Sequence, residues 1–223
     1  PSSFSNDLLN NQILKISRRS KYLILYFRKK LLLIHLGMSG KIFLMDKKKK
    51  IFKTSFYYDL NILEKHNHIY LELNNNFILI YNDVRRFGFF KLYNKSCLKE
   101  ISFLNKLGIE PLSKKFNIKY FSRFVLKKKK NIKKLLMDQT FISGLGNIYV
   151  NEALFMSKIS PLRKCSDINT NEISNLISNI KKILKLSISK GGSSIKDYRN
   201  TSGKSGNFQQ FFYVYDQKDN KCS

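Results

Sequence analysis

The chain has 223 residues, of which 43% are hydrophobic, so it can bury one large core or two modest ones and is not a disordered chain. Its 42 lysines and arginines against 15 acidic residues give a formal net charge of +27, which indicates a polyanionic partner. We favour nucleic acid over a membrane surface as that partner. The three cysteines have no paired short spacing, which excludes a disulfide framework. No apolar run is long enough to span a membrane. Together these features predict a soluble cytoplasmic protein.

Short β-prone apolar runs fill the first part of the chain. They cover residues 22–27, 31–35, 42–44, 69–73, 77–81 and 89–92. The basic residues 28–30 separate the first two runs and predict a hairpin, and the asparagines at 74–76 predict a turn between two later runs. So many short strands favour a β-sandwich.

The hydrophobic period becomes helical at a domain boundary that we predict between residues 95 and 105. The clearest helix is expected over residues 170–189, with Asn169 and Glu172 as its N-terminal cap and Gly191 as its stop. One face of this helix is apolar throughout, so we expect the helix to be part of the core scaffold.

Two further segments follow that helix. The stretch from Gly191 to Gly206 is polar and rich in glycine and serine, which predicts a loop. The stretch from Phe208 to Tyr215 is rich in aromatic residues and is typical of a strand.

Residues 127–161 have the pattern of two amphipathic helices joined by a glycine-containing turn. The second helix is expected to begin near Asn147, directly after Gly146, so its free backbone N–H groups and positive dipole end would bind an anion. Six lysines between residues 127 and 134, Lys129 among them, add the cationic footprint expected for a nucleic-acid backbone. An ordinary helical hairpin with a solvated lysine face explains this stretch equally well.

Two loops of the strand region hold residue types that could enter a base stack. His35-Leu36-Gly37-Met38-Ser39-Gly40 ends a strand with two glycines around a methionine, so the backbone turns sharply and presents Met38 at a tip. Asp83-Val84-Arg85-Arg86-Phe87-Gly88 places two arginines and an aromatic after another strand. Taken alone, Met38 is better explained as core filler, and the arginines as a surface pair over a buried Phe87.

Two basic blocks accompany these loops. Arg18-Arg19-Ser20-Lys21-Tyr22 precedes the first strong strand and would, on its own, be a solvated basic edge. Lys65-His66-Asn67-His68 contains two histidines at a spacing that could suggest a metal. We reject a metal there because no cysteine or acid cluster accompanies them.

These blocks resemble, in order and spacing, those of the formamidopyrimidine-DNA glycosylase family. The similarity runs from about Arg18 to Cys222 and includes Leu136-Met137-Asp138 and Gly144-Leu145-Gly146-Asn147-Ile148-Tyr149. It implies an α+β fold made of three parts. Residues 1–98 would be an incomplete β-sandwich without its N-terminal helix and first strands, 99–205 a helix-two-turn-helix domain, and 206–223 the start of a truncated zinc-finger hairpin.

The resemblance also implies roles for single residues. Met38, Arg85 and Phe87 would fill the gap left by an extruded base, with Arg85 bonding the orphaned base. Lys21 matches a lysine that contacts the target phosphate and assists strand cleavage, and is the catalytic candidate. The remaining DNA-binding candidates are His66, Lys129, Gly146 and Asn147. The partner would be double-stranded DNA containing oxidised purines, bound by a monomer associated with the bacterial nucleoid.

Several blocks depart from the family pattern, and three of these departures bear on the chemistry. The chain has no P-E-L-P-E block, whose proline amine attacks the sugar and whose glutamate handles protons. Cys222 matches the first of four zinc-ligand cysteines, but the other three are not in the sequence, so we expect zinc in a full-length member and none in this chain. Ser205 and Asn207 replace a proline and a tyrosine in the loop that would fold over the flipped base.

Three functions therefore remain open. The first is a bifunctional DNA glycosylase and abasic-site lyase that removes 8-oxoguanine and formamidopyrimidines. The second is a catalytically inactive remnant that still binds damaged DNA. The third, a generic basic RNA-binding protein, explains the charge but not the blocks.

Overall fold

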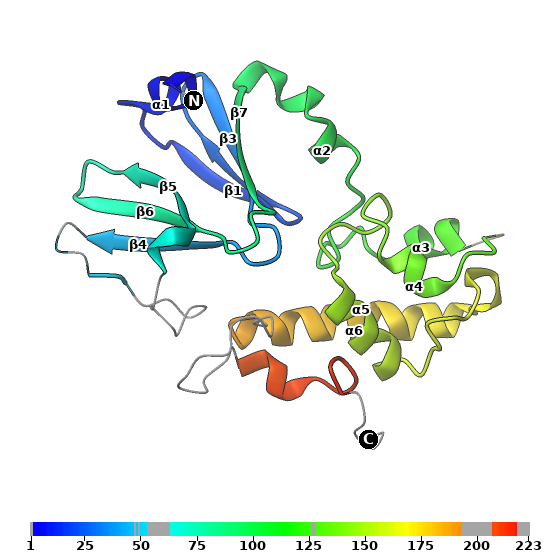
Figure 1. Ribbon diagram of the computed structural model, residues 1–223. Helices are drawn as coiled ribbons and strands as arrows, with labels where there is room; N and C mark the ends of the chain where they lie inside the picture. The colour runs from blue at the N-terminus through cyan, green and yellow to red at the C-terminus, as the bar shows by residue number, and fades with distance from the viewer. Residues whose placement is uncertain are drawn as a thin grey trace. The chain divides into compact units, whose positions relative to one another are not determined.

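The described residues form two compact units, one made of the residues up to Ile101 and the other of those from Ser102 onward (Figure 1). The computed structural model describes residues 2–46, 48, 50–52, 63–125, 128–192 and 207–217. The first unit holds two antiparallel sheets, and the second is helical.

The first sheet has the strand order β1-β2-β3-β7. Its strands are β1 Lys15–Arg19, β2 Tyr22–Tyr26, β3 Lys30–His35 and β7 Phe89–Asn94. The predicted hairpin of β2 and β3 is confirmed, and Tyr22 pairs with His35. Strand β1 was not predicted, because it is an edge strand whose one large apolar residue, Ile16, is 64% exposed and so gives no burial pattern.

The second sheet has the order β4-β6-β5, with strands β4 Lys41–Asp46, β6 Phe77–Asn82 and β5 Asn67–Glu72. The predicted asparagine turn joins β5 to β6, and Asn76 there has a φ of 65°, a left-handed conformation that asparagine tolerates. A register irregularity between Asn67 and Ile69 bends β5 near its start.

The two sheets share one apolar core, which confirms the predicted sandwich. Leu25, Leu32 and Ile34 of the first sheet are buried, and Ile42 and Leu71 of the second sheet pack against them. A short helix, α1 Ser2–Leu8, adds Phe4 and Leu8 to the same core, and its Asp7 pairs with Lys30 at 3.2 Å.

The second unit is built around one long helix. Its helices are α2 Ser102–Asn105, α3 Ile118–Val125, α4 Ile132–Leu136, α5 Asn147–Met156 and α6 Thr170–Ser189. The predicted apolar face of α6 is buried against α3, α4 and α5, with Leu176 and Ile180 fully enclosed. Short 3-10 helices also occur in the described parts of both units: η1 Glu64–His66 and η2 Lys95–Glu100 in the first, and η3 Cys165–Asp167 and η5 Asn207–Phe211 in the second.

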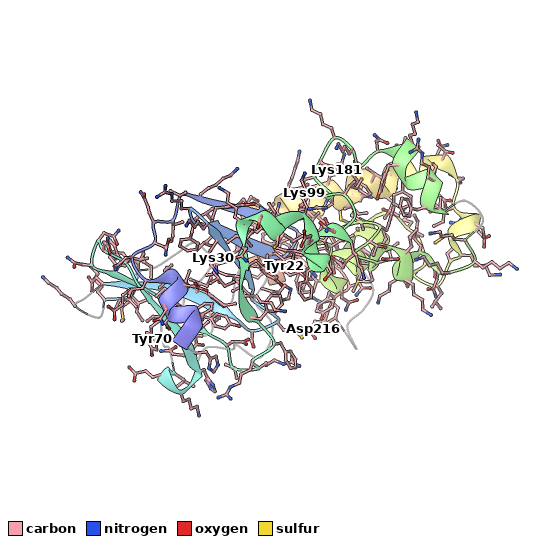
Figure 2. The ribbon with its side chains drawn as sticks, turned by 90° about the horizontal axis from the view of Figure 1, so that it is seen from above. Tyr22, Lys30, Tyr70, Lys99, Lys181 and Asp216 are labelled. Carbon is pink, nitrogen blue, oxygen red and sulfur yellow. The ribbon has the colours of Figure 1, made fainter. Side chains whose placement is uncertain are left out.

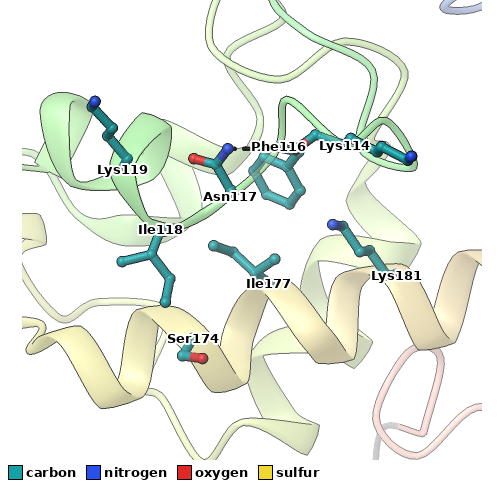
Figure 3. A pocket seen from close by; sticks show the side chains of 8 residues that line it. All are labelled: Lys114, Phe116, Asn117, Ile118, Lys119, Ser174, Ile177 and Lys181. Carbon is teal, nitrogen blue, oxygen red and sulfur yellow. Dashed lines mark hydrogen bonds between the residues drawn. The ribbon is translucent and has the colours of Figure 1, made fainter.

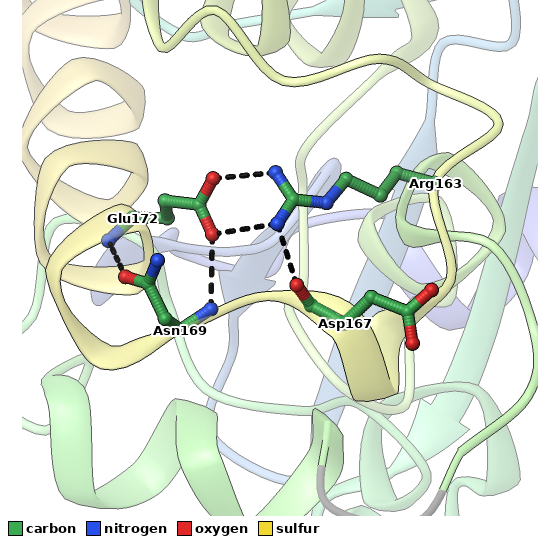
Figure 4. A network of polar contacts seen from close by, with 4 residues as sticks. All are labelled: Arg163, Asp167, Asn169 and Glu172. Atoms are coloured by element: carbon green, nitrogen blue, oxygen red, sulfur yellow. Dashed lines mark hydrogen bonds and ion pairs between the residues drawn. The ribbon is translucent and has the colours of Figure 1, made fainter.

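The predicted cap of α6 is a reciprocal one. The Asn169 side chain accepts from the Glu172 backbone N–H at 3.0 Å, and the Glu172 carboxylate accepts from the Asn169 N–H at 2.9 Å (Figure 4). The Arg163 guanidinium binds the same carboxylate through both terminal nitrogens and also donates to the Asp167 carbonyl. These bonds, the one from Arg163 first, lower the pKa of Glu172.

The prediction of a strand over residues 208–215 is wrong. The segment begins with the 3-10 turn η5, and Phe208 is fully buried against the core. The backbone N–H groups of Tyr213, Val214 and Tyr215 donate to the buried Glu152 carboxylate, at 2.8, 3.1 and 2.8 Å, instead of to a partner strand. A side chain distant in sequence thus determines the local conformation.

Candidate nucleic-acid interface

The loop after β3 presents Met38 to solvent. Gly37 has a φ of 67° and donates its N–H to His35 Nδ1 at 3.1 Å, and Gly40 N–H closes the turn on the Leu36 carbonyl at 2.9 Å. The Met38 side chain is 52% exposed. Met38 is therefore not core filler.

The loop after β6 presents Arg85 and Phe87. Phe87 is 56% exposed, so the alternative of a buried phenylalanine under an arginine pair is wrong. The Arg85 guanidinium carbon lies 4.7 Å from the centre of the Phe87 ring, within cation–π range. Arg86 between them has a φ of 57°, an uncommon conformation for a residue with a side chain.

These two loops are in contact with each other. A Cβ atom on Gly37 would lie 2.6 Å from the Gly88 nitrogen and 2.7 Å from the Phe87 carbonyl carbon, so only glycine permits this approach. Gly88 is equally confined, because a Cβ there would meet the Tyr81 hydroxyl and the His35 carbonyl. Met38, Arg85 and Phe87 therefore extend from one continuous surface of the sheet unit.

Lys21 lies beside the same surface. It follows Ser20, whose φ is 56°, in the turn between β1 and β2, and it precedes Tyr22, which pairs with His35 at the base of the Met38 loop. Burial first, and then the charge of Lys21, lowers the pKa of the His35 imidazole. The Lys21 side chain reaches solvent, but partial desolvation still lowers the pKa of its amine.

The histidine block is attached to the Arg85 loop through Asp83. His66 in η1 accepts the Asp83 N–H on its carbonyl at 3.0 Å, and His68 Nε2 lies 2.8 Å from the Asp83 carbonyl oxygen. Within the part of the chain that the structure describes, no group of three or more His, Cys, Asp or Glu side chains could hold a metal ion. Cys222 lies outside the described residues, so its assignment as a zinc ligand stays a prediction.

The turn between α4 and α5 is held by Gln139. Its side chain accepts the Gly144 N–H at 2.8 Å and donates to the Leu145 carbonyl at 3.0 Å. Gly144 has a φ of 87°, which only glycine adopts at low cost. The turn therefore has one defined shape at the start of α5.

Helix α5 begins at Asn147 as predicted, with Gly146 as its N-cap. Glycine offers no capping side chain, and for the N–H groups of Asn147, Ile148 and Tyr149 the described residues supply no acceptor. Asn147 itself is exposed. Three free donors and the positive end of a ten-residue helix therefore face solvent, an arrangement that suits a phosphate.

The lysines before α4 differ in what they contact. Lys128 Nζ lies 5.1 Å from the Phe124 ring centre, and Lys130 Nζ pairs with Asp138 at 3.1 Å. Lys129 lies between them, is exposed, and has no partner among the residues described. Of these three, Lys129 is the lysine available to an external anion.

Positive charge is spread over both units. Lysine side chains extend from many elements, with Lys30 of β3, Lys99 of η2 and Lys181 of α6 among them (Figure 2). No helix in the described part of the chain is both long and apolar enough to cross a membrane. Charge by itself therefore does not locate a candidate interface, whereas the exposed loops and the start of α5 single out defined positions.

A cleft of about 500 Å³ lies between the segment leading into α3 and helix α6 (Figure 3). Its floor is apolar and its rim is basic, and the lining residues are Lys114, Phe116, Asn117, Ile118, Lys119, Ser174, Ile177 and Lys181. Lys181 Nζ lies 5.8 Å from the Phe116 ring centre. None of the predicted site residues lines this cleft, and it contains no carboxylate, thiol or imidazole for acid–base chemistry.

Three polar residues that shape these sites were given no role from the sequence, although Asp83 and Glu152 stand in the blocks that carry the family resemblance. Asp83 and Gln139 fold the two loop regions, and Glu152 holds the 213–215 backbone. A signal existed only for Asp83, since an acid directly before a turn commonly binds its own backbone N–H groups.

Comparison with protein families gives two matches that together cover most of the chain. Residues 1–90 match the model "Formamidopyrimidine-DNA glycosylase N-terminal domain", and residues 107–199 match "Formamidopyrimidine-DNA glycosylase H2TH domain".

Curated relatives agree with these models. A formamidopyrimidine-DNA glycosylase of Zymomonas mobilis is 39% identical over 223 residues, covering 100% of this chain and 77% of the relative. One from Wolbachia pipientis is 39% identical over 219 residues, covering 97% of this chain and 76% of the relative.

Solved structures show the same similarity. A complex of Lactococcus lactis Fpg with DNA containing an abasic site has a TM-score of 0.82 at 34% identity, covering 100% of this chain and 77% of that one. A complex of the Lactococcus lactis protein with DNA containing Fapy-dG has a TM-score of 0.82 at 33% identity, with the same coverage.

Proposed function

The chain belongs to the formamidopyrimidine-DNA glycosylase family, the DNA glycosylases of base-excision repair, and from this membership we propose that it acts on duplex DNA containing oxidised purines. The proposed activity is that of a bifunctional glycosylase and abasic-site lyase on 8-oxoguanine and formamidopyrimidines. The proposal assigns residues 1–98 to the catalytic-type domain, 99–205 to the DNA-binding domain and 206–223 to the start of a zinc-finger hairpin. It also implies a cytoplasmic monomer.

One observation carries the proposal: Met38, Arg85 and Phe87 are exposed on two loops that touch each other. Large apolar side chains held in solvent by a tightly packed turn contribute little to folding. Beside a base that has left the stack, they can fill the gap and support the kinked duplex, while the planar guanidinium bonds the unpaired base.

Backbone contacts complete the interface. Gly146 and Asn147 would bind a phosphate through the free N–H groups at the start of α5, and Lys129 would add a cation. On the sheet unit, Lys21 and His66 would contact the phosphates that flank the extruded nucleotide. The lowered pKa of Lys21 suits a group that also transfers a proton during strand cleavage.

A second candidate function is recognition of damaged DNA without cleavage. The exposed loop residues that carry the first proposal would serve recognition alone equally well. Both functions use the same duplex-binding surfaces, so an experiment has to separate binding from chemistry.

Fluorescence anisotropy with matched duplexes tests the shared part of the proposal. A duplex with one 8-oxoguanine or one abasic-site analogue should bind at least about tenfold more tightly than the undamaged duplex. Equal affinity for the duplexes would leave only nonspecific charge. Tighter binding to single-stranded or folded RNA would instead support a generic RNA-binding protein.

Borohydride trapping then distinguishes the two candidates. Incubation of the chain, extended by an N-terminal P-E-L-P-E block, with an 8-oxoguanine duplex and borohydride should yield a covalent protein–DNA product if these residues belong to a glycosylase and lyase. Lesion-selective binding without a trapped product would establish the second candidate in place of the first.

A further inference from the structure

Asp83 is a fully buried acid in the sheet unit, and its carboxylate is saturated with hydrogen bonds. Oδ1 accepts from the Ser39 hydroxyl at 2.5 Å and the Arg85 N–H at 3.2 Å. Oδ2 accepts from the Tyr81 hydroxyl at 2.8 Å and the Gly88 N–H at 3.0 Å. Each oxygen thus takes one backbone N–H and one hydroxyl.

Ser39 makes this cluster a bridge between the two exposed loops. Its hydroxyl donates to Asp83 and also accepts the Arg85 N–H at 3.1 Å. Ser39 directly follows Met38, and Arg85 is two residues before Phe87. One hydroxyl therefore connects the Met38 turn to the turn that carries the other two side chains.

The backbone of Asp83 adds a third segment. Its N–H donates to the His66 carbonyl, and its carbonyl oxygen contacts the His68 ring. The Met38 turn, the Arg85 turn and the His66 segment are thus all bonded to a single residue. No atom of Asp83 is itself placed to touch DNA, since the side chain is enclosed.

We propose that Asp83 is a positioning residue which, through Ser39, holds Met38, Arg85 and Phe87 as one preorganised unit, so that the three side chains enter the duplex together. The entry of the three side chains into DNA rests on the proposed function, but the Ser39–Asp83 bridge is a property of the free protein. Loops that are already ordered lose less conformational freedom on binding than loops that must be ordered by the DNA. Loss of the bridge is therefore expected to reduce lesion recognition more than it reduces the affinity for undamaged duplex.

The chemistry requires an aspartate at this position. Asparagine has only one accepting oxygen. Its NH2 group would therefore face either the Arg85 N–H or the Gly88 N–H, and two donors cannot form a hydrogen bond with each other. Glutamate is one methylene too long for a site without free space. Ser39→Ala is the milder change, because it removes the bridge and leaves the bonds of Asp83 to its own turn intact.

Methyl NMR of the free protein tests the bridge directly. The chain has four methionines, so Met45, Met137 and Met156 serve as internal references for Met38. Ser39→Ala and Asp83→Asn should lower the order parameter of the Met38 methyl group and leave the other three unchanged. An unaltered Met38 order parameter in both variants would overturn the inference whatever the protein does with DNA.

A second measurement tests the consequence for lesion recognition. With 2-aminopurine opposite an abasic-site analogue, binding should raise the fluorescence as the base unstacks, and Ser39→Ala should reduce this rise at least threefold while plain-duplex affinity changes less than twofold. Ser39→Thr, which keeps the hydroxyl, should restore the rise. A full rise in Ser39→Ala would contradict the inference.

Asp46→Asn is the matched control. Asp46 also accepts a backbone N–H, that of Lys50 at 2.8 Å, but it lies at the opposite end of β4 from the loop that ends at Gly40. Asp46→Asn should leave both the Met38 order parameter and the 2-aminopurine fluorescence unchanged. If the wild-type chain gives no lesion-dependent fluorescence while its Met38 methyl group responds to Ser39→Ala, the proposed function fails and the inference about Asp83 holds.

Discussion

Met38 is a large apolar side chain that the fold leaves in solvent, and its removal should separate binding from stability. Met38→Ala should change the free energy of unfolding by no more than about 0.5 kcal/mol, because the side chain is 52% exposed and is not part of the buried core. It should weaken binding to an abasic-site duplex about tenfold, because the wedge is lost. Urea denaturation and anisotropy measure the two effects.

The control for Met38→Ala is Leu162→Ala. Leu162 is 77% exposed and lies on the helical unit, outside the proposed interface. This variant should be neutral in both assays. An equal loss of lesion binding in both variants would contradict a specific role for Met38.

Lys129 is expected to act through charge alone. Lys129→Ala should weaken binding to damaged and undamaged duplexes by the same factor and reduce the slope of log affinity against log salt by about 1. Anisotropy titrations at several salt concentrations measure the slope. Lys119→Ala, which removes an exposed lysine of the cleft beside α3, is the matched control and should change the slope less.

At the scale of elements, the start of α5 allows a test in which stability and binding move in opposite directions. Asn147→Asp places a negative charge beside the helix N-terminus, which should stabilise the protein by about 0.3–1 kcal/mol. The same charge should repel a phosphate and weaken duplex binding. Thermal denaturation and anisotropy measure both signs, and tighter DNA binding by this variant would exclude a phosphate at this terminus.

The cap of α6 predicts a dependence of stability on pH. Because the folded pKa of Glu172 is depressed below its ordinary value of 4.5, its contribution is present above that pH and is lost as the pH falls further. Arg163→Met should therefore lower the free energy of unfolding by about 1–2 kcal/mol at neutral pH and by much less near roughly pH 3. Urea denaturation at both pH values measures the difference.

Arg123→Met provides the comparison for Arg163→Met. Arg123 is an exposed arginine on α3, and its replacement should leave the pH profile of stability unchanged. A loss at neutral pH that persists unchanged at acid pH would show that Arg163 acts through packing and not through Glu172.

At the scale of the whole molecule, the formal charge of +27 predicts that affinity for any duplex falls steeply as salt rises. The ratio of affinities for damaged and undamaged duplexes should change little, because both complexes release similar numbers of counterions and the lesion-specific contacts go to bases and not to phosphates. Anisotropy with both duplexes across a salt series checks this. A ratio that collapses to one at high salt would show that the preference is electrostatic.

Much of the fold follows from local patterns in the sequence. The hairpin of β2 and β3, the asparagine turn, the capped helix α6 and the start of α5 were all predicted, because each depends on residues a few positions apart. The family resemblance adds the order of the blocks. The candidate residues Met38, Arg85 and Phe87 are likewise visible in the sequence as residue types beside glycines.

Only the tertiary structure decided which of those side chains remain in solvent and what holds them there. The Ser39–Asp83 bond joins residues 44 positions apart, and the Glu152 carboxylate meets a backbone more than 60 positions away. Burial and hydrogen bonding at such separations depend on how two sheets, or two helices and a loop, pack together. A short window of sequence does not contain that information, which is why Phe87 could be expected inside and the 208–215 segment could be expected to be a strand.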